Sequence, residues 1–129
     1  MTIADWCILG AALLPLITLA PVKVFDRSAY DNADPRAPGF YRDGLRARVW
    51  GAHLNGFEAF PFFAVAVLLS EMRHAPQGMI DALAAGYVAV RLGYMAAYLG
   101  DRPALRSALW ALGLLLNIAL MVLPALSAR

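Results

Sequence analysis

Polar side chains recur at helical spacing inside an apolar segment of this chain. Arg48, Asn55 and Glu58 lie within about 80° of one another on a helix that turns ~100° per residue. Ionisable groups at membrane depth are unfavourable, and they usually face a partner helix or a wet cavity rather than lipid. One face of this segment is therefore polar, and a structural or functional reason is expected for it.

A second polar stripe occupies a later apolar segment. Tyr87, Arg91, Tyr94 and Tyr98 follow one another at spacings of four, three and four residues, which places them on one side of a helix. Arg91 falls in the middle of its segment and must be paired, and Glu58 is the predicted partner. Breaking such a buried pair by removing one member costs roughly 3–5 kcal/mol.

These groups have the chemistry to bind a small, charged, peptide-like ligand at the membrane boundary. Arginines hold carboxylates through forked hydrogen bonds, asparagine both donates and accepts, and tyrosine hydroxyls donate to anions. A nearby guanidinium also lowers the pKa of a ligand thiol. The candidate site residues are Arg48, Asn55, Glu58, Arg91, Tyr94, Tyr98, Arg106 and Ser107. The alternative, given equal weight, is a polar network that only fixes how the helices pack.

Other kinds of site find little support in the sequence. His53 and His74 are far apart and belong to no metal-ligand pattern, so no metal site is predicted. His53 is expected to be a helix contact. Cys7 is the single cysteine, which excludes an internal disulfide and a thiolate cluster. The net charge of +2 is small and unevenly spread, so no nucleic-acid partner is expected.

The composition indicates a membrane protein. Of 129 residues, 61% are hydrophobic and 16% charged, against roughly 45–50% and 25% in soluble domains. Four apolar segments, at about 3–22, 49–69, 79–99 and 105–126, have close to the ~20 residues that cross a bilayer. The predicted fold is an all-α, four-helix transmembrane bundle in one domain over residues 1–129. The first segment is expected to be a retained helix rather than a signal peptide, ending near Pro21.

Charge predicts the orientation of these segments. The first and third connections, with the start of the fourth segment, carry eight of the eleven Lys and Arg residues. With four spans these connections share a side, which the positive-inside tendency makes cytoplasmic. Both termini then face the other side. The long connection over residues 25–45 either covers the site or is simply solvated.

Two motifs resemble the MAPEG family, the membrane-associated proteins of eicosanoid and glutathione metabolism. The second segment carries Arg48 followed by Ala52-His53-x-Asn55-x-x-Glu58-x-Phe60-Pro61. The third and fourth carry Arg91-x-x-Tyr94-x-x-x-Tyr98, a short turn, and Arg106-Ser107. The resemblance implies a homotrimer in a bacterial inner membrane that binds glutathione between neighbouring subunits. It also implies conjugation of glutathione to a lipophilic electrophile, or glutathione-dependent reduction of one.

The resemblance also assigns roles to the matching positions. Asn55 and Glu58 would contact the glutathione backbone and its amino group, while Tyr94 and Tyr98 would help to hold the tripeptide. Further roles are implied for Arg91 in supporting the site, for Arg48 at the carboxylate end, and for Arg106 in stabilising the thiolate.

Three positions depart from the family pattern. Gly51 stands where the eicosanoid enzymes generally have an arginine, Ala59 where an aromatic or polar group is common, and Trp110 where some members have tyrosine. Losing an arginine that grips a carboxylate would remove roughly 1.5–3 kcal/mol. The alternative function is therefore a non-catalytic membrane protein of this fold, whose polar network serves assembly or binds another ligand.

Overall fold

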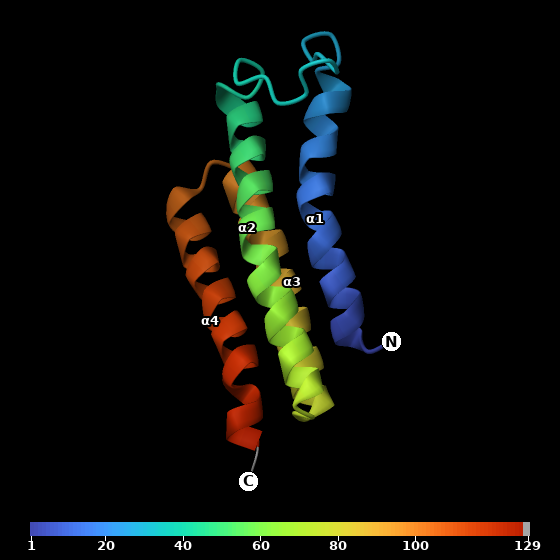
Figure 1. The fold of residues 1–129 in the computed structure, drawn as a ribbon. Coiled ribbons are helices and arrows are strands. Elements are labelled where there is room, and N and C mark those ends of the chain that lie inside the picture. The colour runs from blue at the N-terminus through green and yellow to red at the C-terminus, as the bar shows by residue number, and fades with distance from the viewer. Residues whose placement is uncertain (128–129) are drawn as a thin grey trace.

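The computed structural model describes residues 1–127, which fold into four antiparallel α-helices (Figure 1). They are α1 (Ile3–Phe25), α2 (Gly44–Met72), α3 (Gln77–Leu99) and α4 (Pro103–Ser127). All four are long and apolar enough to cross a membrane. The predicted all-α, four-helix transmembrane fold is confirmed.

The helices extend beyond the apolar segments read from the sequence. In α1 the helix continues through Pro21 to Phe25, so the predicted end near Pro21 is wrong. A proline removes one helical hydrogen bond, but a membrane helix tolerates this where neighbouring groups satisfy the freed backbone. The N-terminus is fixed by a capping box, in which Thr2 Oγ1 accepts from the Asp5 amide and Asp5 accepts from the Thr2 amide.

Two helices form the centre of the bundle and two flank it. Both α2 and α3 contact α1 and α4, whereas within residues 1–127 α1 and α4 do not touch. Figure 1 shows α1 and α4 on opposite sides of the central pair. The α1–α2 and α3–α4 connections lie toward one end, and both termini with the α2–α3 turn lie toward the other.

The larger apolar core of the bundle draws residues from all four helices. Phe63 and Tyr87 stack with ring centroids 4.0 Å apart and an interplanar angle of 14°. Val67, Ile80 and Leu120 are fully buried around them. Aromatic stacking of this kind adds about 0.5–1.5 kcal/mol beyond the burial of area.

A buried serine compensates for a proline in the neighbouring helix. Pro124 has no amide hydrogen, so the carbonyl of Leu120, one turn earlier in α4, lacks its usual helical donor. Ser70 of α2 donates to this carbonyl at 2.6 Å, and both residues are fully buried. The hydroxyl thereby satisfies a backbone group that would otherwise be unpaired in an apolar core.

Helices α1 and α2 pack closely against each other at Gly56. A Cβ placed at Gly56 would lie 2.6 Å from Cγ of Pro15 and 3.1 Å from its Cβ. One turn earlier in α2, the buried His53 donates from Nδ1 to the Pro15 carbonyl at 2.8 Å. His53 is thus a helix contact, as predicted.

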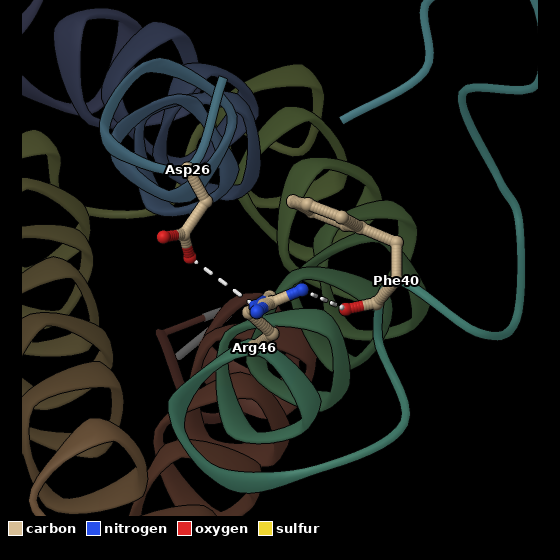
Figure 2. A network of polar contacts seen from close by, with 3 residues as sticks. All are labelled: Asp26, Phe40 and Arg46. Atoms are coloured by element: carbon tan, nitrogen blue, oxygen red, sulfur yellow. Dashed lines mark hydrogen bonds and ion pairs between the residues drawn. The ribbon is translucent and has the colours of Figure 1, made fainter. Parts of the chain in front are cut away.

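The connection between α1 and α2 folds back onto the helix ends. Arg46 of α2 pairs with Asp26 at the end of α1, with 3.2 Å between Nε and Oδ2. Its Nη1 also donates to the Phe40 carbonyl at 3.4 Å (Figure 2). One arginine therefore links both ends of the connection.

Aromatic rings hold the same connection against α2. Tyr41 is buried, stacks on Trp50 at 4.4 Å between centroids, and donates its hydroxyl to the Pro35 carbonyl at 3.1 Å. Burial raises the pKa of the Tyr41 phenol, with Lys23 acting to lower it and Tyr30 to raise it. The phenol keeps its proton at neutral pH, so the hydrogen bond to Pro35 persists.

Candidate functional site

A cavity of about 220 Å³ lies between α2, α3 and α4. Its walls combine four polar side chains with apolar and aromatic ones. The lining residues are Asn55, Glu58, Ala59, Phe62, Tyr87, Arg91, Trp110, Gly113, Leu114 and Asn117. The polar faces that the sequence predicted on the second and third helices therefore meet at one place.

Arg91 is the buried charge of this cavity. Only 7% of the residue is exposed, yet its guanidinium forms no ion pair with a carboxylate of residues 1–127. Its Cζ instead lies 4.4 Å from the ring centroid of Tyr94. The predicted ion pair between Arg91 and Glu58 is wrong for the single chain, because the tyrosine ring takes up the guanidinium while Glu58 stays exposed.

Two amide side chains in the cavity wall have unused hydrogen-bonding capacity. Within residues 1–127, the carbonyl oxygens of Asn55 and Asn117 are buried and have no hydrogen-bond partner. The Asn55 amide nitrogen reaches the Glu58 carboxylate only at 3.5 Å. Buried polar groups are nearly always paired, so these two oxygens are available to accept a hydrogen bond from a ligand or from water.

A second cavity of about 260 Å³ lies nearer the α3–α4 turn. Tyr94, Tyr98, Arg106, Ser107 and Trp110 line it. Arg106 stacks over Tyr98, with Cζ 4.6 Å from the ring centroid, and Tyr98 meets Tyr94 edge-on at 5.6 Å. The ring holds the Arg106 guanidinium at the cavity wall without neutralising its charge.

The two cavities share Trp110 and follow one face of α4. Together their volumes fall in the range of roughly 300–1,000 Å³ typical of small-ligand pockets. Of the eight candidate site residues, Arg48 alone lies outside them. Along this site, Arg91 lies in the inner cavity and Arg106 in the outer one.

Arg48 is engaged with the α3–α4 turn. Its Nε donates to the Leu99 carbonyl at 3.1 Å, and its Nη1 lies 3.9 Å from the exposed Asp101 carboxylate. The Leu99 carbonyl ends α3, where helix carbonyls lack helical donors. The observed contacts of Arg48 therefore join the start of α2 to the end of α3.

Gly51 admits the ring of Tyr98. A Cβ built on Gly51 would overlap the Tyr98 hydroxyl and lie 2.8 Å from Cζ of the same ring. The missing side chain at this position thus leaves room for a tyrosine of the site. Any larger residue here requires Tyr98 to move away from Gly51.

Several wall residues were not predicted as part of a site from the sequence. Trp110, Gly113, Leu114 and Asn117 line the α4 side. Their spacing of i, i+3, i+4 and i+7 marks a single helix face. That spacing was the available signal, but the helix is apolar nearly all round, so the face did not stand out.

Comparison with known proteins gives one match. A family model described as the MAPEG family matches residues 3–126. Neither the curated proteins nor the solved structures contain a match to the chain. Among residues 1–127, no group of three or more His, Cys, Asp or Glu side chains is placed to hold a metal ion.

Proposed function

The chain belongs to the MAPEG family, and on that premise we propose that it is a glutathione-dependent transferase or peroxidase acting on lipophilic electrophiles. Four membrane-spanning helices make it an integral membrane protein. One observation carries the proposal: Arg106 is held over Tyr98 at the wall of the outer cavity, next to the cavity of Arg91. This arrangement places two guanidinium groups along one elongated site.

The charges of the site suit a tripeptide that carries carboxylate and ammonium groups. Arg91 and Arg106 are the cations of the two cavities, and neither has a carboxylate partner within residues 1–127. The exposed Glu58 carboxylate and the unpaired Asn55 oxygen can accept from an ammonium group. Arg91 can therefore pair with a glutathione carboxylate and Glu58 with the ammonium group, which leaves Arg106 for the thiol.

The proposed role of Arg106 is electrostatic. Glutathione supplies a thiol, and a guanidinium beside a thiol lowers its pKa and increases the fraction of nucleophilic thiolate. Tyr98 orients the guanidinium by stacking, and Ser107 adds a hydroxyl donor at the same wall. In conjugation the thiol proton would pass to water, and the thiolate sulfur would form a bond to an electrophilic carbon while the bond from that carbon to its leaving group breaks and the leaving group departs with the bonding electron pair.

Glu58 supports the proposal of a homotrimer. The carboxylate lies midway along α2 and is exposed in the single chain, where the surrounding membrane would leave it unsolvated. An ionised group at that depth faces protein or a wet cavity. We infer that a second copy covers this face, so that the ligand lies between neighbouring subunits. The proposed location is a bacterial inner membrane, with the α1–α2 and α3–α4 connections in the cytoplasm.

Thiolate formation tests the enzyme. Glutathione added to the purified protein in detergent should give an ultraviolet thiolate band at neutral pH. Arg106→Ala should abolish this band, and Arg106→Lys should weaken it, since a lysine keeps the charge but loses the planar stack on Tyr98. Arg102→Ala is the matched control, because Arg102 is exposed and lies outside both cavities. A wild-type protein without the band would exclude the proposed activation of the thiol.

The second candidate function is non-catalytic, and the Arg48 contacts favour it. That arginine contacts the α3–α4 turn, which leaves one cation fewer for ligand carboxylates. In that case the polar groups serve assembly, and Glu58→Gln should dissociate the oligomer in mild detergent. Oligomers of the Glu58→Gln variant that stay intact would count against this function.

A further inference from the structure

Asn117 lies near the middle of α4, and the proposed function leaves its side chain unused. Only 3% of the residue is exposed, and it lines the inner cavity. Within residues 1–127, its Oδ1 atom is buried and accepts no hydrogen bond. A buried acceptor without a donor is unfavourable, above all at the middle of a membrane span, where water is scarce. The inner cavity therefore offers a hydrogen-bond acceptor for a ligand.

The wall that leads from the outer cavity to Asn117 is apolar. Trp110 belongs to both cavities, and Gly113 and Leu114 follow it on the same face of α4. From Trp110 to Asn117 the helix axis rises about 10 Å, and from Arg106 about 16 Å, at ~1.5 Å per residue. This face of α4 thus runs from the cation of the proposed thiol site, over apolar side chains, to a neutral acceptor.

The chemistry of the Asn117 amide selects an uncharged donor. A carboxylate cannot donate to the amide oxygen, and neither can a carbonyl, an ether or a nitro group. An ammonium group can donate, but an unpartnered charge at this depth of the membrane is unfavourable. A hydroxyl donates without carrying a charge. Because it also accepts, a hydroxyl can pair with the amide nitrogen of the same side chain as well.

We propose that the Asn117 end of the inner cavity is a subsite for a hydroxyl group, and that the electrophile is an apolar chain with a hydroxyl remote from its reactive carbon. The identification of the ligand as the electrophile rests on the proposed function, whereas the binding of the hydroxyl does not. The reactive carbon lies at the outer cavity beside Arg106, and the hydroxyl lies about 10–16 Å away at Asn117.

Bromodecanol is a suitable probe, because it carries a bromine at one end of an alkyl chain and a hydroxyl at the other. In the variant Trp6→Phe/Trp50→Phe, Trp110 is the sole tryptophan, and bromine quenches tryptophan fluorescence on contact. Without glutathione, bromodecanol should quench Trp110 roughly three- to tenfold more effectively than bromodecane at equal mole fraction in detergent micelles, which is the ordinary contribution of one hydrogen bond.

Matched variants assign this preference to the amide. Leucine is close to asparagine in size but has no acceptor, so in Asn117→Leu the two probes should quench alike. Leu114→Val is the control, because it alters the apolar wall and leaves the acceptor in place; there the preference for bromodecanol should persist. Without ligand, Asn117→Leu should keep or raise the thermal midpoint, since it removes an unpaired buried polar group.

Conjugation separates the subsite from the proposed enzyme. With glutathione present, the thiol proton passes to water, the sulfur bonds to the terminal carbon, and bromide leaves with the bonding electron pair. The value of kcat/KM should be several-fold higher for bromodecanol than for bromodecane, and Asn117→Leu should remove this difference. Preferential quenching by bromodecanol without conjugation of either probe would refute the transferase and leave the hydroxyl subsite standing.

Three results would overturn the subsite itself. The first is equal quenching of Trp110 by the two probes, or no quenching by either. The second is a preference for bromodecanol that survives Asn117→Leu. The third is a fall in the thermal midpoint of Asn117→Leu, or dissociation of its oligomer, because either would show that the amide is paired within the chain or with a second copy.

Discussion

A single methyl group at Gly51 should disturb the outer cavity through Tyr98. The Cβ of Gly51→Ala would overlap the Tyr98 hydroxyl and lie 2.8 Å from Cζ, so the ring must rotate away. Tyr98 is also stacked under Arg106 and meets Tyr94 edge-on. Movement of the ring therefore weakens both contacts.

Two opposing terms set the size of this effect. Alanine is favoured over glycine in a helix interior by about 1 kcal/mol, whereas overpacking costs about 1–3 kcal/mol. Gly51→Ala should therefore leave stability unchanged or lower it by up to about 2 kcal/mol. In a Tyr98→Ala background the overlap is absent, and the same change should stabilise the protein by up to about 1 kcal/mol.

The double-mutant cycle compares the wild type, Gly51→Ala, Tyr98→Ala and the double variant. Reversible unfolding in mixed detergent micelles gives the free energy of unfolding of each. The expected coupling between the two positions is about 1–3 kcal/mol, which is large enough to resolve. Gly51→Ala should also weaken the glutathione thiolate band, because Arg106 loses its stacking partner. Equal effects of Gly51→Ala in both backgrounds would refute the idea that this glycine accommodates Tyr98.

The remaining predictions concern how the helices are joined. Ser70→Ala should lower the free energy of unfolding by about 1–3 kcal/mol, because it leaves the buried Leu120 carbonyl unpaired. In a Pro124→Ala background the backbone amide of residue 124 can donate to that carbonyl, so Ser70→Ala should cost much less. An equal loss in both backgrounds would contradict the proposed pairing of Ser70 with the Leu120 carbonyl. Thermal unfolding should show Gly56→Ala to be about 1–3 kcal/mol less stable than Gly10→Ala, because overlap with Pro15 is added to the same helix preference for alanine. Gly10→Ala is the control, since a Cβ there meets no atom within 4 Å, and a comparable loss in both variants would argue against close packing at Pro15.

The fold was predictable because each helix carries its own signal. Apolar length predicted the four spans, and the spacing of Asn55 and Glu58 predicted which face of α2 would be polar. Helical periodicity shows on which side of its helix a residue lies. This was enough to predict that the polar faces carrying Asn55, Glu58 and Arg91 meet, as they do at one cavity. These features depend on residues close in sequence, so they are readable without coordinates.

The pairings within the site were less predictable, because they depend on distances between helices. Glu58 and Arg91 line the same cavity, yet Arg91 lies over the adjacent Tyr94 rather than against the carboxylate. Arg48 shares the predicted polar face but reaches the end of α3. In the sequence, Gly51 is noticed only because the family pattern has an arginine there. That the glycine makes room for the Tyr98 ring can be seen only in the packed structure.

The contacts of the connection between α1 and α2 were likewise not predictable from the sequence. From the sequence, the connection over residues 25–45 either covers the site or is simply solvated. In the structure Arg46 closes it through contacts with Asp26 and Phe40 (Figure 2). Tyr41 of the connection stacks on Trp50. These contacts join residues from the connection to the first turns of α2, and no local pattern identifies them.

Binding of glutathione tests the central claim most directly. A ligand that binds only the folded protein stabilises it by mass action, by about 2.7 kcal/mol at a concentration of 100 Kd. Millimolar glutathione should therefore raise the thermal midpoint of the purified protein in detergent, whereas an equal concentration of cysteine, which has the thiol without the tripeptide, should not. An unchanged midpoint across the glutathione titration would contradict the proposed function.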